Sequence, residues 1–210
     1  MKKRNLAAGL LACIWVASVQ ADPGADVYTK GGANPAALAC LTCHGADGMG
    51  MAAAGFPRLA GLSAEYMKKQ LLDFQSGSRA HPVMLPIASA LTEGEMQSVS
   101  LYIGQMTTPD YPRINRSAEA ASVGERLALR GAWERNIPEC VACHGPGGVG
   151  VGAAFPPLAG QSSAYLSSQL IAWKKGTRTN DPNDLMGHIA KSLTDDEVKA
   201  VSDYFSGLGQ

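Results

Sequence analysis

The sequence predicts an all-α protein built from two tandem domains that are related by an internal repeat. The pentapeptide CLTCH at residues 40–44 returns as CVACH at residues 140–144. The segments after each copy also match, and their apolar residues recur at helical spacing without strand-like alternation. Each half has about a hundred residues or fewer, which is little for an apolar core without a bound group.

The N-terminus has the pattern of a secretory signal peptide. Lys2, Lys3 and Arg4 precede an apolar run from Leu6 to Val19, and Ala21 closes an acceptable cleavage site. A retained membrane anchor is the alternative, but the run is short for a bilayer. We therefore expect residues 1–21 to be removed and the mature chain to reside in the periplasm.

The composition excludes some classes of function. The whole chain has 18 basic and 18 acidic residues, and removing the leader would leave a mature chain with three more acidic than basic residues. Nothing in this balance suggests binding to nucleic acid. The four cysteines that remain all lie in the two pentapeptides, so no disulfide framework is predicted.

Three helical pieces are expected in each half. The first runs into the pentapeptide, from about Asn34 in one half and from about Ser117 in the other. A glycine-rich loop follows, at 45–55 and 145–152. A second helix is expected over 63–76 and over 162–175, and it ends before a glycine in both halves.

The last helix opens with the capping-box pattern Thr-x-x-Glu, at 92–95 and again at 194–197. Between the second and last helices the repeat offset rises from 99 to 102, which places a three-residue insertion most simply in the loop 179–184. Two prolines and no apolar periodicity mark a linker at 109–116. The predicted domains are therefore 22–108 and 117–210.

The pentapeptides predict two covalently bound haem c groups. In Cys-x-x-Cys-His the two thiols lie one helical turn apart, so both can add to the vinyl groups of one haem while the histidine binds the iron. This assigns Cys40, Cys43, Cys140 and Cys143 to haem attachment, and His44 and His144 to the irons. A shared zinc ion would leave the histidines unexplained. A thioredoxin-like redox pair would need a βαβ setting.

Met84 and Met186 are the candidates for the second axial ligands. Each lies eight residues before its capping box, in a segment expected to be a loop, and no other methionine outside the leader has a repeat partner. His81 and His188 are rivals at unequal offsets, so no common geometry would serve both. Pro57 and Pro156 could each place the preceding carbonyl against a ligand histidine.

These residues resemble the cytochrome c4 family of dihaem periplasmic cytochromes. The likeness covers nearly the whole mature chain: two Cys-x-x-Cys-His-Gly motifs, Phe-Pro-x-Leu-Ala-Gly followed by Tyr and Gln-Leu, the late methionine, and a last helix with Tyr102 or Tyr204. Leu62 departs from the pattern, since the second half has Gln161 there. The resemblance implies two class I cytochrome c domains about a pseudo-twofold axis, with haem propionates near the interface.

The resemblance also implies a function. Such proteins carry electrons in the bacterial periplasm, often in loose association with the membrane, between a quinol-oxidising complex and a terminal oxidase. Iron closed by histidine and methionine cannot bind a substrate, so we predict an electron carrier that is not an enzyme. The alternatives are a dihaem subunit of a larger dehydrogenase, or a dihaem enzyme of the peroxidase or thiosulfate-oxidising type.

Overall fold

The computed structural model describes residues 22–108, 110–111, 114 and 119–208. In the N-terminal half the helices are α1 (Pro23–Lys30), α2 (Leu41–His44), α3 (Ala64–Ser76), α4 (Met84–Ala90) and α5 (Glu93–Gly104). In the C-terminal half they are α6 (Val123–Arg130), α7 (Cys140–His144), α8 (Ser163–Lys174), α9 (Leu185–Ser192) and α10 (Asp195–Gly207). Within the described residues the only β-pairing consists of isolated bridges. The five helices thus repeat in the same order.

The helix predicted from Asn34 is wrong. The side chain of Asn34 instead accepts the backbone N–H of Ala36 at 3.0 Å, which closes a turn. The first helix lies earlier, because the carboxylate of Asp22 accepts the Gly24 N–H at 2.8 Å and starts α1 there. The corresponding start at Ser117 lies outside the described residues, and α6 begins after Ser122, which caps it.

The second and last helices form where they were predicted. Ser63 and Ser162 cap α3 and α8, and Gly77 ends α3 in the left-handed conformation at φ +80°. The last helices, α5 and α10, both begin with a complete capping box. Local sequence was sufficient here because caps act on the residues next to them.

Each half closes by crossing its first helix over its last at a glycine. A Cβ atom on Gly24 in α1 would overlap the backbone of Ser98 in α5, and one on Gly124 in α6 would overlap the backbone of Ala200 in α10. Only glycine permits so close an approach. The sequence analysis did not single out these two glycines, although they stand 100 residues apart in the repeat.

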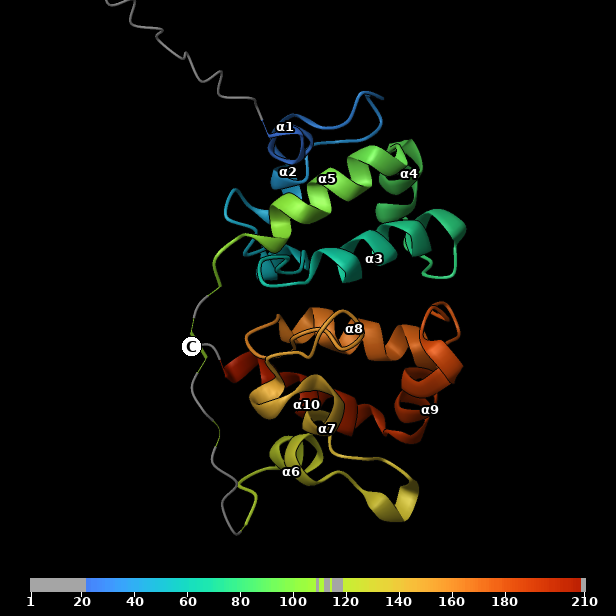
Figure 1. Cartoon of the computed structure of the whole chain (residues 1–210). Helices are drawn as coiled ribbons and strands as arrows, with labels where there is room; N and C mark the ends of the chain where they lie inside the picture. Colours follow the sequence, from blue (N-terminus) through green and yellow to red (C-terminus); the bar gives the residue numbers. More distant parts are fainter. Residues whose placement is uncertain (1–21, 109, 112–113, 115–118, 209–210) are drawn as a thin grey trace, which may run out of the picture.

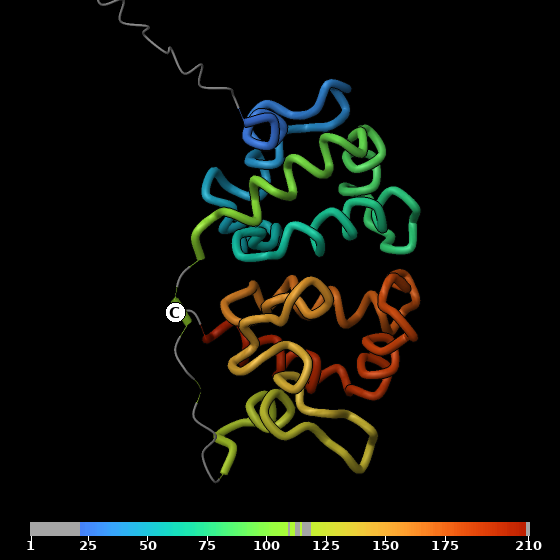
Figure 2. Tube along the Cα trace, in the orientation of Figure 1, coloured from blue at the N-terminus to red at the C-terminus, as the bar shows by residue number. Residues whose placement is uncertain are grey.

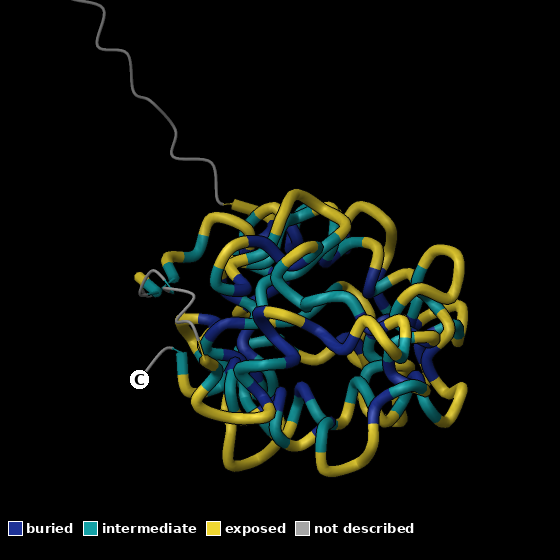
Figure 3. The backbone as a smooth tube through the Cα atoms, turned by 90° about the horizontal axis from the view of Figure 1, so that it is seen from below, coloured by how far each residue is buried: buried dark blue, intermediate teal, exposed yellow. Residues whose placement is uncertain are grey.

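Each half has its own apolar core. One cluster of buried residues draws its members from 27–103, and the other from 127–205. Ile114, within the predicted linker, packs against the second cluster. Figure 3 shows the buried backbone inside and the exposed loops around the rim. The domain limits predicted from sequence remain predictions.

The two halves are stacked with α3 and α8 facing each other (Figure 1). The trace in Figure 2 shows the same arrangement of the two halves. Residues 1–21, the predicted signal peptide, and most of the predicted linker at 109–116 lie outside the described residues. No helix in the described ranges has the length and hydropathy that a membrane span needs.

Candidate functional site

A large apolar pocket lies in the C-terminal half behind the second pentapeptide. Its lining includes Cys140, Cys143 and His144 on one side and Met186 on another. The empty space within it is about 1060 Å³, part of which is open to solvent. Apolar walls of this kind exclude water and suit a flat aromatic group.

Both histidines are held by a hydrogen bond from the ring. The Nδ1 of His44 donates to the carbonyl of Pro57 at 2.9 Å, and that of His144 donates to the carbonyl of Pro156 at 2.7 Å. Because a carbonyl can only accept, Nδ1 carries the proton and Nε2 keeps its lone pair for a metal. Burial lowers the pKa of both rings, and the bond to the proline carbonyl opposes this effect.

The carbonyls that precede the two prolines do not contact the histidines. The carbonyl of Phe56 accepts the N–H of Met51 at 3.0 Å, and that of Phe155 accepts the N–H of Val151 at 2.8 Å. These bridges occupy the preceding carbonyls, so the prolines' own carbonyls turn toward the rings. The prediction chose the correct prolines and the wrong oxygen.

The glycine loops close onto the histidines in the same way in the two halves. The carbonyl of His44 accepts the N–H of Gly50 at 2.8 Å, and the carbonyl of His144 accepts the N–H of Gly150 at 2.7 Å. Gly50 has φ +78° and Gly150 has φ +87°, conformations that favour glycine. Each loop thereby brings the following Phe-Pro segment back onto its histidine.

The cysteines have the environment of neutral thiols. They form no disulfide, and burial raises the pKa of Cys40 to about 11 and that of Cys140 to about 12. A redox-active pair would instead need a lowered thiol pKa. Among the described residues no group of three or more Cys, His, Asp or Glu side chains could hold a metal ion. The zinc and thioredoxin alternatives therefore have no support in the structure.

The two candidate methionines lie at the starts of short helices and not in loops. Met84 is the first residue of α4, and Met186 is the second residue of α9. Met186 lines the same pocket as His144, whereas the rival His188 is exposed and does not line it. His81 is also exposed, and its Nδ1 accepts the N–H of Met84 at 3.2 Å.

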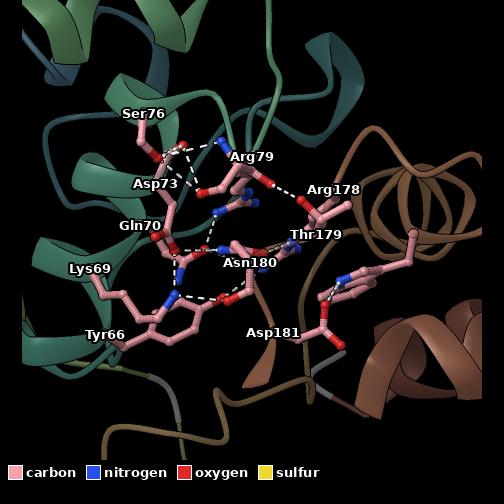
Figure 4. A network of polar contacts seen from close by, with 12 residues as sticks. Tyr66, Lys69, Gln70, Asp73, Ser76, Arg79, Arg178, Thr179, Asn180 and Asp181 are labelled. Atoms are coloured by element: carbon pink, nitrogen blue, oxygen red, sulfur yellow. Dashed lines mark hydrogen bonds and ion pairs between the residues drawn. The ribbon is translucent and has the colours of Figure 1, made fainter. Parts of the chain in front are cut away.

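A polar network joins the two halves beside this pocket (Figure 4). Arg79 donates to Tyr165 at 2.8 Å and to Gln169 at 2.6 Å, both on α8. Arg178 reciprocally donates to Tyr66 at 3.4 Å and to Gln70 at 3.2 Å, both on α3. The exchange of equivalent contacts is what a pseudo-twofold interface produces.

The two arginines are buried, and no carboxylate of the described residues pairs with them. Arg79 is 6% exposed and Arg178 is 5% exposed, and the side chains that accept their hydrogen bonds are neutral. Burial lowers the pKa of Arg178, and the nearby Arg79 adds to this. Two buried cations are costly without an anion. Arg178 lines the pocket, so its positive charge suits a bound group that carries carboxylates, as haem does.

A second contact between the halves explains the departure at Leu62. The side chain of Gln161 accepts the backbone N–H of Arg58 at 3.1 Å and donates to the Arg58 carbonyl at 2.9 Å. Leu62 cannot make the reciprocal contact and instead lines the pocket of the other half. Arg58 itself is buried, and its guanidinium donates to the carbonyls of Ala60 and Ala159 at 2.8 and 2.9 Å.

The internal repeat includes these interface residues. Tyr66, Gln70 and Arg79 are each matched 99 residues later, but the repeat alone assigned no role to them. Matched polar residues outside the core and the pentapeptides are the signal that could have identified the interface. Arg58 and Gln161 differ from their repeat partners, so the repeat could not reveal their pairing.

Comparison with known proteins identifies the family. The cytochrome c family matches residues 21–107 and 134–209. The "Thiosulfate dehydrogenase electron acceptor" of Stutzerimonas stutzeri (strain A1501) is 64% identical over 97% of this chain and 94% of its own. A cytochrome c4 of Thiocapsa roseopersicina is 40% identical over 81% of this chain and 88% of its own. The resemblance to cytochrome c4 is thereby confirmed.

A solved structure adds a second line of similarity. The thiosulfate dehydrogenase TsdBA of Marichromatium purpuratum superposes with a TM-score of 0.78 at 45% identity, over 88% of this chain. This chain spans only 39% of that longer polypeptide. The predicted all-α fold of two tandem cytochrome c domains, with two haem c groups, is confirmed by the two family matches and the cytochrome c4 relatives.

The prediction that the protein is not an enzyme is contradicted by these comparisons. Two relatives are named as electron acceptors of thiosulfate dehydrogenase, and the similar solved structure is named as that enzyme. The error has a physical source, because the residues that bind haem in a free carrier also bind it in a subunit that serves an enzyme. Haem motifs cannot separate these two cases.

Proposed function

This chain belongs to the cytochrome c family, and from that premise we propose that it is the electron-accepting subunit of a thiosulfate dehydrogenase complex. The protein is a dihaem electron carrier of the cytochrome c type. The proposal adds the donor, which the named relatives suggest. It also retains the periplasm as the compartment, as expected for an exported chain with covalently bound haem.

The observation that carries the proposal is the similarity to the electron acceptor of Stutzerimonas stutzeri, which extends over almost the whole of both chains. The TsdBA structure supports it independently. There a segment similar to this chain makes up 39% of one chain of a protein named thiosulfate dehydrogenase, and the rest of that chain has no counterpart here. Similarity to part of a protein with that name is what the proposal expects.

Four cysteines and four axial residues would hold the two haems. We assign Cys40 and Cys43 to one haem and Cys140 and Cys143 to the other. The axial residues are His44 with Met84 in the N-terminal half and His144 with Met186 in the C-terminal half. Each haem, when bound, supplies an iron that takes up and releases one electron.

The chain's own residues prepare these sites. The proline carbonyls hold each histidine ring so that Nε2 is free to bind. The apolar lining keeps water away from the pocket of the C-terminal half. Arg178 lines the same pocket and provides positive charge for the acidic groups of a haem. The hydroxyl of Ser202, also in this lining, has no hydrogen-bond partner among the residues that the structure describes.

Reduction by thiosulfate tests the donor. The oxidised holoprotein is mixed with thiosulfate and a small amount of the thiosulfate dehydrogenase from the same organism, and haem reduction is followed optically. We expect both haems to be reduced with the enzyme present, and neither to be reduced by thiosulfate with heat-inactivated enzyme. A parallel reaction uses a quinol-oxidising complex as donor.

The second reaction distinguishes the proposed function from the one that the sequence suggested. In that alternative the protein carries electrons from a quinol-oxidising complex to a terminal oxidase. Rapid reduction by the quinol-oxidising complex, with none by the dehydrogenase, would replace the proposal by that alternative. Copurification of the native protein with the dehydrogenase would further support a subunit role. A transient redox interface would be small and sensitive to salt.

A further inference from the structure

The two methionine-bearing helices, α4 and α9, are each capped by a side chain that lies several residues before the helix begins, and this side chain differs between the halves. In α9 the carboxylate Oδ2 of Asp181 accepts the N–H of Met186 at 2.7 Å and the N–H of Gly187 at 3.1 Å. The residue at the usual capping position, Asp184, accepts no backbone N–H of the helix with its side chain, which pairs instead with Lys191 at 3.0 Å. The first turn of α9 therefore depends on Asp181, and one of its two bonds holds the backbone of Met186 itself.

Asp181 is held in place by its other oxygen. The indole N–H of Trp173 in α8 donates to Oδ1 at 2.7 Å. Trp173 is only 9% exposed, and the guanidinium of Arg178 covers its ring at 3.9 Å from the centroid. Figure 4 shows Asp181 at the edge of the network that contains Arg178. A continuous series of contacts thus runs from the domain interface to Met186.

The N-terminal half repeats this plan with other chemistry. The Nδ1 of His81 accepts the N–H of Val83 at 3.3 Å and that of Met84 at 3.2 Å. Its ring lies edge-on to Phe74, with centroids 5.9 Å apart, and Arg79 covers Phe74 at 4.5 Å. Phe74 is the repeat partner of Trp173. In both halves, therefore, an aromatic residue contacts the side chain that caps the methionine-bearing helix.

We propose that Asp181, which accepts a hydrogen bond from Trp173, is the positioning residue that keeps Met186 at the iron. His81, whose ring packs against Phe74, has the same role for Met84. The inference rests on the proposed axial role of the two methionines. A bond between iron and a thioether is held partly by the backbone that presents it, because a loose loop gains entropy when the sulfur leaves. The insertion in loop 179–184 supplies a residue in the C-terminal half that the N-terminal half lacks.

Asp181→Asn tests the proposal in the holoprotein. A carboxylate accepts with both oxygens, whereas the amide of Asn has one acceptor and one donor. No orientation of Asn can accept from both Trp173 and Met186, so one side of the contact must be lost. We measure the rate at which imidazole replaces the ligand of one ferric haem. A rise of about tenfold or more is expected, since one hydrogen bond to a charged group contributes about this factor.

Asp184→Asn is the matched control. It removes the same charge from the same loop, and Asn tolerates its left-handed backbone at φ +53°. The ion pair that it removes, with Lys191, is exposed on both sides and contributes little. It should leave the imidazole rate unchanged. Equal rates in wild type, Asp181→Asn and Asp184→Asn would overturn the proposal. Equal increases in both variants would also overturn it, because charge and not position would then be the cause.

Trp173→Phe is the second variant, and it introduces the residue type that the N-terminal half has at the equivalent position, Phe74. It keeps the packing and removes only the donor, so a smaller rise in the imidazole rate is expected. The optical charge-transfer band of a thioether on ferric iron separates this proposal from the assignment beneath it. If the wild-type band has the intensity of one haem and Met84→Leu abolishes it, Met186 is not a ligand and the proposal falls with it. A two-haem band with unchanged variant rates overturns positioning alone.

Discussion

Replacing Glu197 by glutamine should remove a stabilising contact that exists only when the carboxylate is charged. Glu197 accepts two hydrogen bonds from Arg135, at 2.6 and 2.9 Å, and a third from the N–H of Thr194 at 2.9 Å. The bond from Arg135 is the main reason that the pKa of Glu197 falls from 4.5 to about 2, with burial opposing it and Thr194 assisting. This contact ties the start of α10 to the segment before α7.

The size of the effect follows from that pKa. A fall from 4.5 to about 2 corresponds to about 3 kcal/mol, at about 1.4 kcal/mol per unit. The side chain of Arg135 is 34% exposed, so solvent screens the pair and about 1–2 kcal/mol is the better expectation. Since the folded pKa lies below the unfolded one, this stability is present above about pH 4.5 and disappears as the pH falls toward 2.

Urea unfolding of the holoprotein from pH 7 to pH 3 measures this. Glu197→Gln should be about 1–2 kcal/mol less stable than wild type at pH 7, and the difference should shrink below pH 4.5. Asp196→Asn is the control, since it removes an exposed carboxylate from the same first turn. A difference that does not change with pH, or an equal loss in the control, would refute the reasoning.

Two further predictions concern the contacts that bring elements together. Gln161→Leu leaves the buried N–H and carbonyl of Arg58 without partners and should cost about 2 kcal/mol; faster hydrogen exchange of the Arg58 amide is the measurement, and unchanged exchange would contradict it. Gly124→Ala forces α6 away from α10 and should cost about 1–3 kcal/mol in thermal unfolding. Gly207→Ala meets nothing within 4 Å and should be neutral or slightly stabilising, so equal behaviour of the two would count against the crossing argument.

Much of the candidate site could be predicted because it depends on the spacing of residues that are close in the sequence. The two thiols and the histidine of each pentapeptide lie within five residues, so their relation needs only one helical turn. The methionines were found through the repeat, which fixed their distance from the capping boxes. The structure corrected the predictions about their surroundings. Met84 begins a helix, and the carbonyl that accepts from each histidine ring belongs to the proline itself.

The partner was not decided by the haem motifs. A carrier and an electron-accepting subunit need the same ligands and the same buried pocket, so the prediction of no enzyme role went beyond what those residues contain. The connection to a dehydrogenase, which the proposed function uses, came from the names of the similar proteins.

The sequence alone determined the two haem motifs, the caps of the main helices and the doubling of the fold, since each depends on residues close together in the chain. Only the tertiary structure decided how the halves meet, where Arg79 and Arg178 exchange partners and Gln161 pairs with the backbone of Arg58. It also decided how Asp181 reaches from Trp173 to Met186 within the C-terminal half. These contacts join residues that are distant in sequence or outside any repeating pattern. They depend on how α3 faces α8 and on how α8 packs against α9, neither of which local spacing encodes.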